Sequence, residues 1–304
     1  MEIFKDEPQI LYDGTVVALG NFDGLHVAHM QIIRSGIEYA KAHGLKSGVL
    51  LFEENTKNFT GKKRIELITP NTAKLELLER EKLDFVVMRR FTHEVMEKSP
   101  EEFFGFLVNE LHAKAVCCGY DYSFGYKAEG RVETLRKLGR KYGVEVLVTD
   151  MIMVDGTVVS STAIRELIRE GNMERAELLL GRRYCVEGPV VKGLQNGRKL
   201  GFPTVNVCYD EQMALPKHGV YAGITYAHGK RLKSVINVGN NPTFGAERVT
   251  IESHILNFNE NLYGEYIRVS FAKRLRGEIK FESLDALKAQ IAADAKSVEM
   301  DDEL

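Results

Sequence analysis

The first half of the chain alternates short apolar runs with longer amphipathic stretches. The apolar runs occupy residues 16–19, 48–52, 85–88, 115–118 and 144–148. Runs of this length with almost no polar residue are typical of strands that are buried on both faces. Between the runs, apolar residues recur at helical spacing, for example at Met30, Ile33 and Ile37. Strands that alternate with helices predict a parallel sheet covered by helices, which is an α/β domain.

The pattern changes after Gly181. From there the apolar residues fall into short β-rich runs at residues 184–191, 204–208, 220–226, 232–238, 249–256 and 267–271. The dipeptide His228-Gly229 separates two of these runs, as a tight hairpin turn would. Runs so short and so closely spaced favour an antiparallel β-barrel. A last amphipathic stretch at residues 283–298 predicts a closing helix, with Ser283 as its N-cap.

Length and composition fit two globular domains. The chain has 304 residues, of which 44% are hydrophobic and 28% are charged, as is usual for globular proteins. We expect one domain at residues 1–182 and the other at residues 183–304. The formal net charge of −2 gives no basic excess for nucleic acid, and no apolar run reaches the length of a membrane span. We therefore expect neither nucleic acid nor a membrane as a partner.

The cysteines and the first residues indicate the compartment. The four cysteines are Cys117, Cys118, Cys185 and Cys208, and none forms a C-x-x-C pair. This usage is typical of structural thiols in a reducing environment. The first residues also lack the apolar core of a signal peptide. We therefore expect a cytoplasmic protein.

A glycine-rich turn follows the first apolar run and leads into a predicted helix. It contains Gly20, Phe22, Gly24, His26 and His29. The glycines permit a sharp turn and close approach of the backbone, and the free N–H groups of a helix N-terminus suit a phosphate. Because His26 and His29 are three residues apart, they face the same way on a first helical turn and can both donate hydrogen bonds to a phosphoryl group. The alternative is a pair of surface histidines near a helix start.

A second segment of the first half can also bind an anion. Ser161, Thr162 and Arg165 open another predicted helix. Hydroxyls, free N–H groups and a guanidinium at a helix start together make an anion site. The alternative is a Ser/Thr helix cap beside an exposed arginine.

The second half carries its candidate chemistry in a basic, glycine-rich loop and in the strand after it. The loop contains Gly193 and Arg198 but lacks the spacing of a P-loop, and its alternative interpretation is a solvated turn. Thr204 and Asn206 follow two residues apart, so their side chains lie on one face of a strand. Hydroxyl and amide oxygens are ligands that Mg²⁺ accepts.

Taken in chain order, these motifs closely resemble those of bacterial bifunctional riboflavin kinase/FMN adenylyltransferases, or FAD synthetases. The glycine-rich turn resembles the G-x-F-D-x-x-H-x-G-H signature of the nucleotidyltransferase superfamily, and Gly-Phe-Pro-Thr-Val-Asn at residues 201–206 resembles the riboflavin kinase domain. The resemblance covers residues 16–296. It implies an N-terminal Rossmann-like nucleotidyltransferase domain with a parallel sheet, and a C-terminal antiparallel β-barrel kinase domain with a closing helix.

The resemblance also implies the two reactions. The C-terminal domain would use ATP to phosphorylate riboflavin to FMN, and the N-terminal domain would adenylylate FMN to FAD with release of pyrophosphate. It implies Mg²⁺ as a cofactor, ATP as co-substrate, riboflavin and FMN as substrates, and FMN and FAD as products. The sequence is compatible with transient self-assembly.

The same resemblance assigns roles to single residues. In the N-terminal domain the residues implied at ATP are Gly20, Phe22, Gly24, His26, His29, Ser161, Thr162 and Arg165, and those implied at the flavin are Asp121, Tyr122 and Phe124. His26, His29 and Arg165 would stabilise the charge of the transition state. In the barrel the residues implied at ATP are Gly193, Arg198, Thr204 and Asn206, the last two also binding Mg²⁺. Glu252 would be the general base for the riboflavin 5′-hydroxyl, with Asn237 beside the flavin.

Two departures from the family pattern lie in the N-terminal half. Ala28 stands where the family has glycine, and residues 52–56 read Phe-Glu-Glu-Asn-Thr, with Asn55 and Thr56 in place of the second half of the family's F-x-P-H-P segment. They leave open a riboflavin kinase whose adenylyltransferase domain is impaired or altered. A cytidylyltransferase would share the first motif but would not explain the barrel half. A flavin- or RNA-binding regulatory protein would not need a general base such as Glu252.

Overall fold

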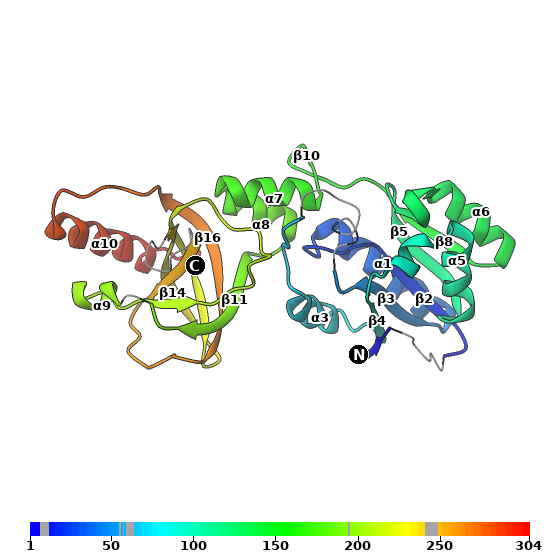
Figure 1. Ribbon diagram of the computed structural model, residues 1–304, viewed down its shortest axis with the longest axis horizontal. Helices are drawn as coiled ribbons and strands as arrows, with labels where there is room; N and C mark the ends of the chain where they lie inside the picture. The colour runs from blue at the N-terminus through cyan, green and yellow to red at the C-terminus, as the bar shows by residue number, and fades with distance from the viewer. Residues whose placement is uncertain (7–11, 55, 57, 59–63, 194, 241–248) are drawn as a thin grey trace. The chain divides into compact units, whose positions relative to one another are not determined.

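The computed structural model describes the whole chain except residues 7–11, 55, 57, 59–63, 194 and 241–248 (Figure 1). Packing divides the chain into two compact units, Met1–Ser161 and Thr162–Leu304. Helices α7 (Ser161–Glu170) and α8 (Met173–Leu180) therefore fall mainly in the second unit, because α8 packs against two strands of its barrel. The domain boundary that the sequence predicts between residues 182 and 183 stays a prediction.

The first unit is built on a six-stranded parallel sheet. Its strand order is β1 (Glu2–Lys5), β4 (Phe85–Arg89), β3 (Lys46–Phe52), β2 (Thr15–Leu19), β5 (Ala113–Gly119) and β8 (Glu145–Thr149). The five predicted strands are confirmed, with ends that differ by a few residues. The edge strand β1 was not predicted, because its residues are mostly exposed and form no apolar run.

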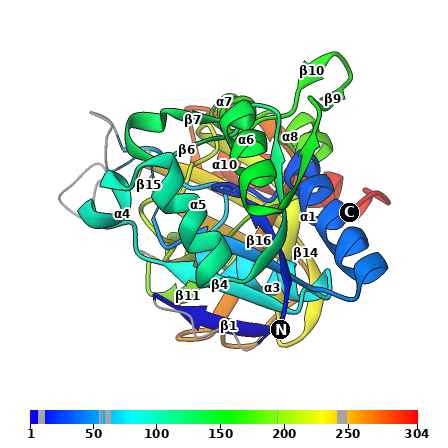
Figure 2. The ribbon, with the colours of Figure 1, turned by 90° about the vertical axis from the view of Figure 1, so that its right-hand side faces the viewer.

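Helices cover both faces of this sheet. They are α1 (Val27–His43), α3 (Asn71–Arg80), α5 (Pro100–Asn109) and α6 (Val132–Tyr142), while the short helix α4 (His93–Glu97) has no buried residue and contacts the turn at residues 126–128. Val16 and Ala18 of β2 pack with α1 and α3, whereas Val17 and Leu19 pack with α5 and α6. Successive side chains of a strand point to opposite faces, so one short apolar run supplies both cores. Figure 2 shows α1 and α5 on opposite sides of the strands.

Three short elements complete the first unit. They are the ribbon of β6 (Ser123–Phe124) with β7 (Gly130–Arg131), the ribbon of β9 (Met153–Val154) with β10 (Thr157–Val158), and the 3₁₀ turn η1 (Tyr126–Ala128). The sequence did not predict them, because two-residue strands carry too few residues for a period.

The strand order places a switch point at the carboxyl end of β2. From β2 the chain passes through α1 to β3 on one side, and from β4 it returns through α5 to β5 on the other side. Connections therefore leave β2 and β5 in opposite directions. In open parallel sheets, ligands bind in the crevice that forms at such a point.

The second unit is a closed antiparallel barrel, as predicted. Its order is β11 (Tyr184–Val191), β12 (Val205–Val207), β15 (Val249–Ile255), β14 (Lys230–Asn240), β13 (Gly219–Ala227) and β16 (Tyr266–Arg276), and β16 pairs with β11 to close it. His228 and Gly229 have φ values of 49° and 70° and form the two-residue turn between β13 and β14. Positive φ at both positions is the geometry that a tight hairpin requires, so the predicted hairpin is confirmed.

Two further helices belong to this unit besides α7 and α8. Helix α10 (Leu284–Glu299) is capped by Ser283, whose hydroxyl accepts from the N–H of Ala286, and it packs on β14 (Figure 1). The short helix α9 (Asn196–Leu200) lies in the basic loop, where no helix was expected. Among the described residues, no helix is long and apolar enough to cross a membrane.

Candidate active sites

The turn after β2 folds inward rather than into solvent. Phe22 and Leu25 have φ values of 47° and 40°, and both side chains are at most 1% exposed. Positive φ is unfavourable for such residues and marks a turn that the surrounding structure must hold in place. Gly24 has φ 93°, and a methyl group there would lie 3.2 Å from Ile68. The positive φ therefore favours glycine at this position, and a larger residue would also crowd Ile68.

Asp23 holds this turn from inside. Its carboxylate is buried and accepts hydrogen bonds from the backbone N–H groups of Ile68 at 3.0 Å and Thr69 at 3.3 Å. The hydroxyl of Ser161 donates to the Asp23 carbonyl at 2.8 Å. The structure thus joins Ser161 to the glycine-rich turn, as the sequence-based hypothesis requires. The bracing role of Asp23 was not predicted, because its partners lie far away in the chain.

His26 and His29 lie face to face at the start of α1. Their rings are stacked with centroids 3.5 Å apart, and His26 is only 3% exposed. Nδ1 of His26 caps the helix by accepting from the N–H of His29 at 3.3 Å. In a neutral imidazole the other nitrogen then carries the proton and is a donor. The expectation that the two histidines face the same way is confirmed, and they are not loose surface side chains.

The remaining predicted residues of this site lie on helices. Thr162 and Arg165 lie on α7 in the second unit, where Arg165 is 7% exposed. Ala28, which replaces the family's glycine, is the second residue of α1 and is half-buried. The part these residues play at a nucleotide stays a prediction.

An apolar cavity of about 430 Å³ lies at the switch point. Its lining includes Gly20, Asn21, Phe52, Thr56, Phe91, Phe103, Tyr122 and Phe124. Flat rings form much of the wall: Phe52 packs edge-on to Phe91 with centroids 5.0 Å apart, and Tyr122 stacks on Phe124 at 5.7 Å. Cavities of this size with apolar walls and few polar groups suit a planar organic ligand. Asp121 is exposed and is not part of this lining.

The segment that replaces the family's histidine and prolines reaches this cavity. Thr56 donates a hydrogen bond from its hydroxyl to Oδ1 of Asn21 at 2.9 Å, and both residues line the cavity. The loop after β3 is thereby joined to the turn after β2. Asn55 lies outside the described residues.

In the barrel, the predicted polar residues form a row across three strands. Asn206 on β12 pairs in register with Glu252 on β15, and Glu252 pairs with Asn237 on β14. Residues directly opposite on neighbouring strands share a face. Thr204, two residues before Asn206, donates from its hydroxyl to Oε2 of Glu252 at 3.4 Å. A methyl group at Gly193 would clash with the Asn206 amide, so the basic loop passes directly against this row.

The surroundings of Glu252 change its acidity. Burial raises the pKa of Glu252 above its ordinary value, and the hydrogen bond from Thr204 opposes this shift. His254 lies on the same strand face, where its Nδ1 is 2.8 Å from the carbonyl of Pro203 and its ring packs edge-on to Phe202. His254 therefore supports the segment that carries Thr204, as a packing histidine does.

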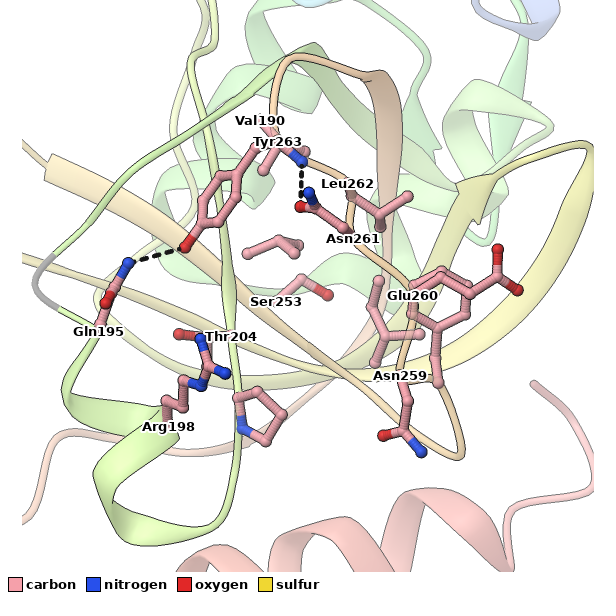
Figure 3. A pocket seen from close by; sticks show the side chains of 14 residues that line it. Val190, Gln195, Arg198, Thr204, Ser253, Asn259, Glu260, Asn261, Leu262 and Tyr263 are labelled. Carbon is pink, nitrogen blue, oxygen red and sulfur yellow. Dashed lines mark hydrogen bonds between the residues drawn. The ribbon is translucent and has the colours of Figure 1, made fainter.

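A second cavity, of about 460 Å³, opens beside Thr204 (Figure 3). The basic loop contributes Gln195 and Arg198 to its wall, and residues 258–263 between β15 and β16 form the opposite wall. Figure 3 shows Gln195 and Tyr263 pointing toward one another across the cavity, where Nε2 of Gln195 donates to the Tyr263 hydroxyl at 3.1 Å. Thr204 thus lines the cavity while its hydroxyl contacts Glu252.

In the comparison with known proteins, the two parts of the chain match two different family models. A family model described as FAD synthetase matches residues 9–163, and one described as riboflavin kinase matches residues 180–300. The bifunctional riboflavin kinase/FMN adenylyltransferase of Haemophilus influenzae is 34% identical over 93% of this chain and 93% of its own length. The Escherichia coli K12 protein of the same description is 36% identical over 93% of this chain and 91% of its own. The chain belongs to the bifunctional riboflavin kinase/FMN adenylyltransferase family.

A solved structure supports the fold of this family member. It is described as a macrolide-efflux protein from Streptococcus pneumoniae, and it matches with a TM-score of 0.90 and 28% identity over 99% of both chains. That description names an efflux protein, whereas both family models name flavin enzymes.

The sequence missed residues that reach the sites through tertiary structure. Phe52 and Phe91 meet because β3 and β4 are neighbours in the sheet, and residues 258–263 reach the second cavity from a loop. An aromatic residue at the end of a predicted strand is the only signal that could have indicated Phe52.

Proposed function

We propose that the two reactions of this family take place at the two sites described above. Riboflavin would be phosphorylated to FMN beside Glu252 in the barrel, and FMN would be adenylylated to FAD at the switch point of the parallel sheet. The observation that carries the kinase assignment is the row of Asn206, Glu252 and Asn237, with Thr204 joining it to a cavity.

In the kinase reaction, Glu252 acts as the general base. It takes the proton of the riboflavin 5′-hydroxyl while that oxygen bonds to the γ-phosphorus of ATP and the bond from this phosphorus to the bridging oxygen of ADP breaks. Burial raises the pKa of Glu252, which makes its carboxylate a stronger proton acceptor. ATP occupies the cavity of about 460 Å³, with Arg198 of its lining near the phosphates, and Gly193, which lies against Asn206, would approach them from the basic loop.

The donor set around Thr204 fits a magnesium ion. Thr204 and Asn206 offer a hydroxyl and an amide oxygen, and the carboxylate of Glu252 lies beside them. Mg²⁺ is commonly held by one or two protein oxygens together with substrate phosphates. A bound Mg²⁺ would neutralise phosphate charge during transfer.

In the adenylyltransferase reaction, no protein nucleophile is needed. The phosphate of FMN attacks the α-phosphorus of ATP, and the bond to the leaving pyrophosphate breaks. His26, His29 and Arg165 stabilise the charge that develops. The flavin ring occupies the aromatic cavity of about 430 Å³, where Tyr122 and Phe124 lie. Asp121 would stand at its entrance.

The assignment is tested by following FMN and FAD chromatographically with riboflavin, ATP and magnesium. FMN followed by FAD is expected, and FMN alone would indicate the alternative, a kinase with an impaired or altered adenylyltransferase domain. Glu252→Gln should lower the rate of FMN formation by about 10²–10⁴-fold and leave FAD formation from added FMN unchanged. Because burial disfavours the charged form of Glu252, the variant should unfold at no lower temperature. Parallel loss of both reactions would refute the two-site assignment.

We also propose a functional boundary between residues 182 and 183, a cytoplasmic location, and no nucleic acid or membrane partner. Transient self-assembly is compatible with the sequence, which does not define the oligomeric state.

A further inference from the structure

The loop between β15 and β16 forms one wall of the barrel cavity. Residues 258–263 of this loop line the cavity, which Figure 3 shows with Asn259, Glu260, Asn261 and Tyr263 arranged along it. Backbone hydrogen bonds hold the two ends of the loop: Leu256 donates to Lys233 at 2.9 Å, and Gly264 donates to Val190 at 3.0 Å. Neither bond involves residues 258–263, the middle of the loop.

The hairpin between β13 and β14 adds charged contacts to the middle of the loop, beside the Leu262 side chain, which is 2% exposed, and the hydrogen bond from Gln195 to Tyr263. Nδ1 of His228 lies 2.9 Å from Oε2 of Glu260, and Nζ of Lys230 lies 3.3 Å from Oε1 of the same carboxylate. Nε2 of His228 lies 3.6 Å from Oε1 of Glu265. The His228 ring also packs near Phe258 with centroids 6.2 Å apart. His228 of the turn and Lys230 at the start of β14 thus contact three residues of the loop.

The turn and the charged contacts differ in what they contribute to the loop. His228 and Gly229 both have positive φ, the geometry of a two-residue turn that matches the twist of its two strands. The hydrogen bond from His228, and then that from Lys230, lower the pKa of Glu260, so the carboxylate is charged at neutral pH. The Glu260 side chain is nevertheless 51% exposed, and exposed ion pairs are individually weak. The contact can therefore shift the position of the loop without deciding whether the barrel folds.

We propose that His228 and Lys230 are positioning residues of the kinase reaction, which hold Glu260 and hence the middle of the loop where it walls the ATP cavity. This inference rests on the proposed function of the barrel. If these contacts are lost, only a fraction of the molecules hold the loop in the position that binds ATP. The apparent Kd for ATP then equals the intrinsic Kd divided by that fraction, so the affinity falls. The transfer step at Glu252 is unaffected once ATP is bound.

Steady-state kinetics of FMN formation test this inference. We expect Lys230→Glu and the double variant His228→Ala/Lys230→Ala each to raise KM for ATP about threefold to tenfold, with kcat changed less than about twofold. Arg231→Ala is the matched control, because Arg231 is an exposed cation next to Lys230 on β14 and no ion pair to it is found among the described residues. FAD formation from added FMN by the same samples is the second reference and should not change.

A charge swap separates positioning from a general effect of charge near ATP. Glu260→Lys combined with Lys230→Glu restores an attractive pair with its polarity reversed. Its KM for ATP should lie at least about threefold below the product of the two single effects. The inference would be overturned if His228→Ala/Lys230→Ala left KM for ATP unchanged, or if the variants lowered kcat alone. It would also be overturned if Arg231→Ala raised KM for ATP equally, or if the charge swap showed no coupling in KM. If the unaltered protein makes no FMN, the proposed function fails instead, whatever the variants do.

Discussion

At the scale of single residues, the environment of Glu252 sets when it can accept a proton. The sequence indicates the residue types through the family resemblance, but the register of β12, β15 and β14 places Asn206 and Asn237 on either side of it. Burial raises its pKa above the ordinary value of 4.5, and the Thr204 hydroxyl partly opposes that shift. A general base works only when deprotonated. FMN formation is therefore lost as the pH falls through a pKa that lies above the ordinary carboxyl value.

Removing the Thr204 hydroxyl should move this acid limb to higher pH. Thr204→Val keeps the side-chain shape but removes the hydrogen bond that lowers the Glu252 pKa, so the carboxylate protonates earlier as the pH falls. Thr204→Ser keeps the hydroxyl and is the control. The measurement is kcat/KM for FMN formation between about pH 5 and 8. If all three proteins share one limb, a group other than Glu252 limits the reaction.

At the scale of elements, the sequence predicts helices and strands long enough to show a periodic pattern of apolar residues. It misses short elements and contacts between residues that are far apart in the chain. The five buried strands and the barrel strands were predictable because apolar runs and turn residues recur along the chain. The short ribbon of β6 with β7 and the helix α9 have too few residues for a period. The contact of Asp23 with Ile68 and Thr69 crosses a separation that no spacing rule covers.

The Asp23 contact joins the turn after β2 to the segment just before α3, and its loss should affect one site only. Asp23→Ala leaves the N–H groups of Ile68 and Thr69 without their buried acceptor, at a cost of about 1–3 kcal/mol in the free energy of unfolding. The turn that carries His26 is then less well held, so FAD formation should fall about tenfold or more, while FMN formation continues. Asp23→Asn keeps one oxygen acceptor, so its stability and its rate of FAD formation should lie between those of the unaltered protein and of Asp23→Ala. The readouts are chemical denaturation and the two reaction rates. Equal loss of FMN and FAD formation would mean that the effect of Asp23 is not confined to the site at the turn after β2.

At the scale of the whole molecule, the boundary found by packing and the boundary expected from function differ. The riboflavin kinase model begins at residue 180, whereas the second compact unit begins at Thr162. The difference comprises helices α7 and α8; Met173, Ala176 and Leu179 of α8 are fully buried, and α8 packs against β11 and β16. Sequence periodicity identifies this helix and its apolar face. It does not reveal which domain that face covers, because either core could bury it.

Two fragments decide whether α7 and α8 are part of the kinase domain, because the shorter one lacks both helices. A fragment of residues 162–304 keeps the apolar face of α8 on the barrel, whereas a fragment of residues 183–304 leaves the covered patch of β11 and β16 in water. Burial of side chains of this size contributes about 1.5–3 kcal/mol each, and ordering the helix offsets part of this. We expect the shorter fragment to be less stable by about 3–6 kcal/mol and to lose most of its FMN formation. Denaturant unfolding and FMN formation are measured on both, with Leu179→Ala in the longer fragment as an intermediate case, expected to lose about 2–4 kcal/mol. Equal stability and equal activity of the two fragments would instead make residues 182 and 183 the boundary for folding as well as for function.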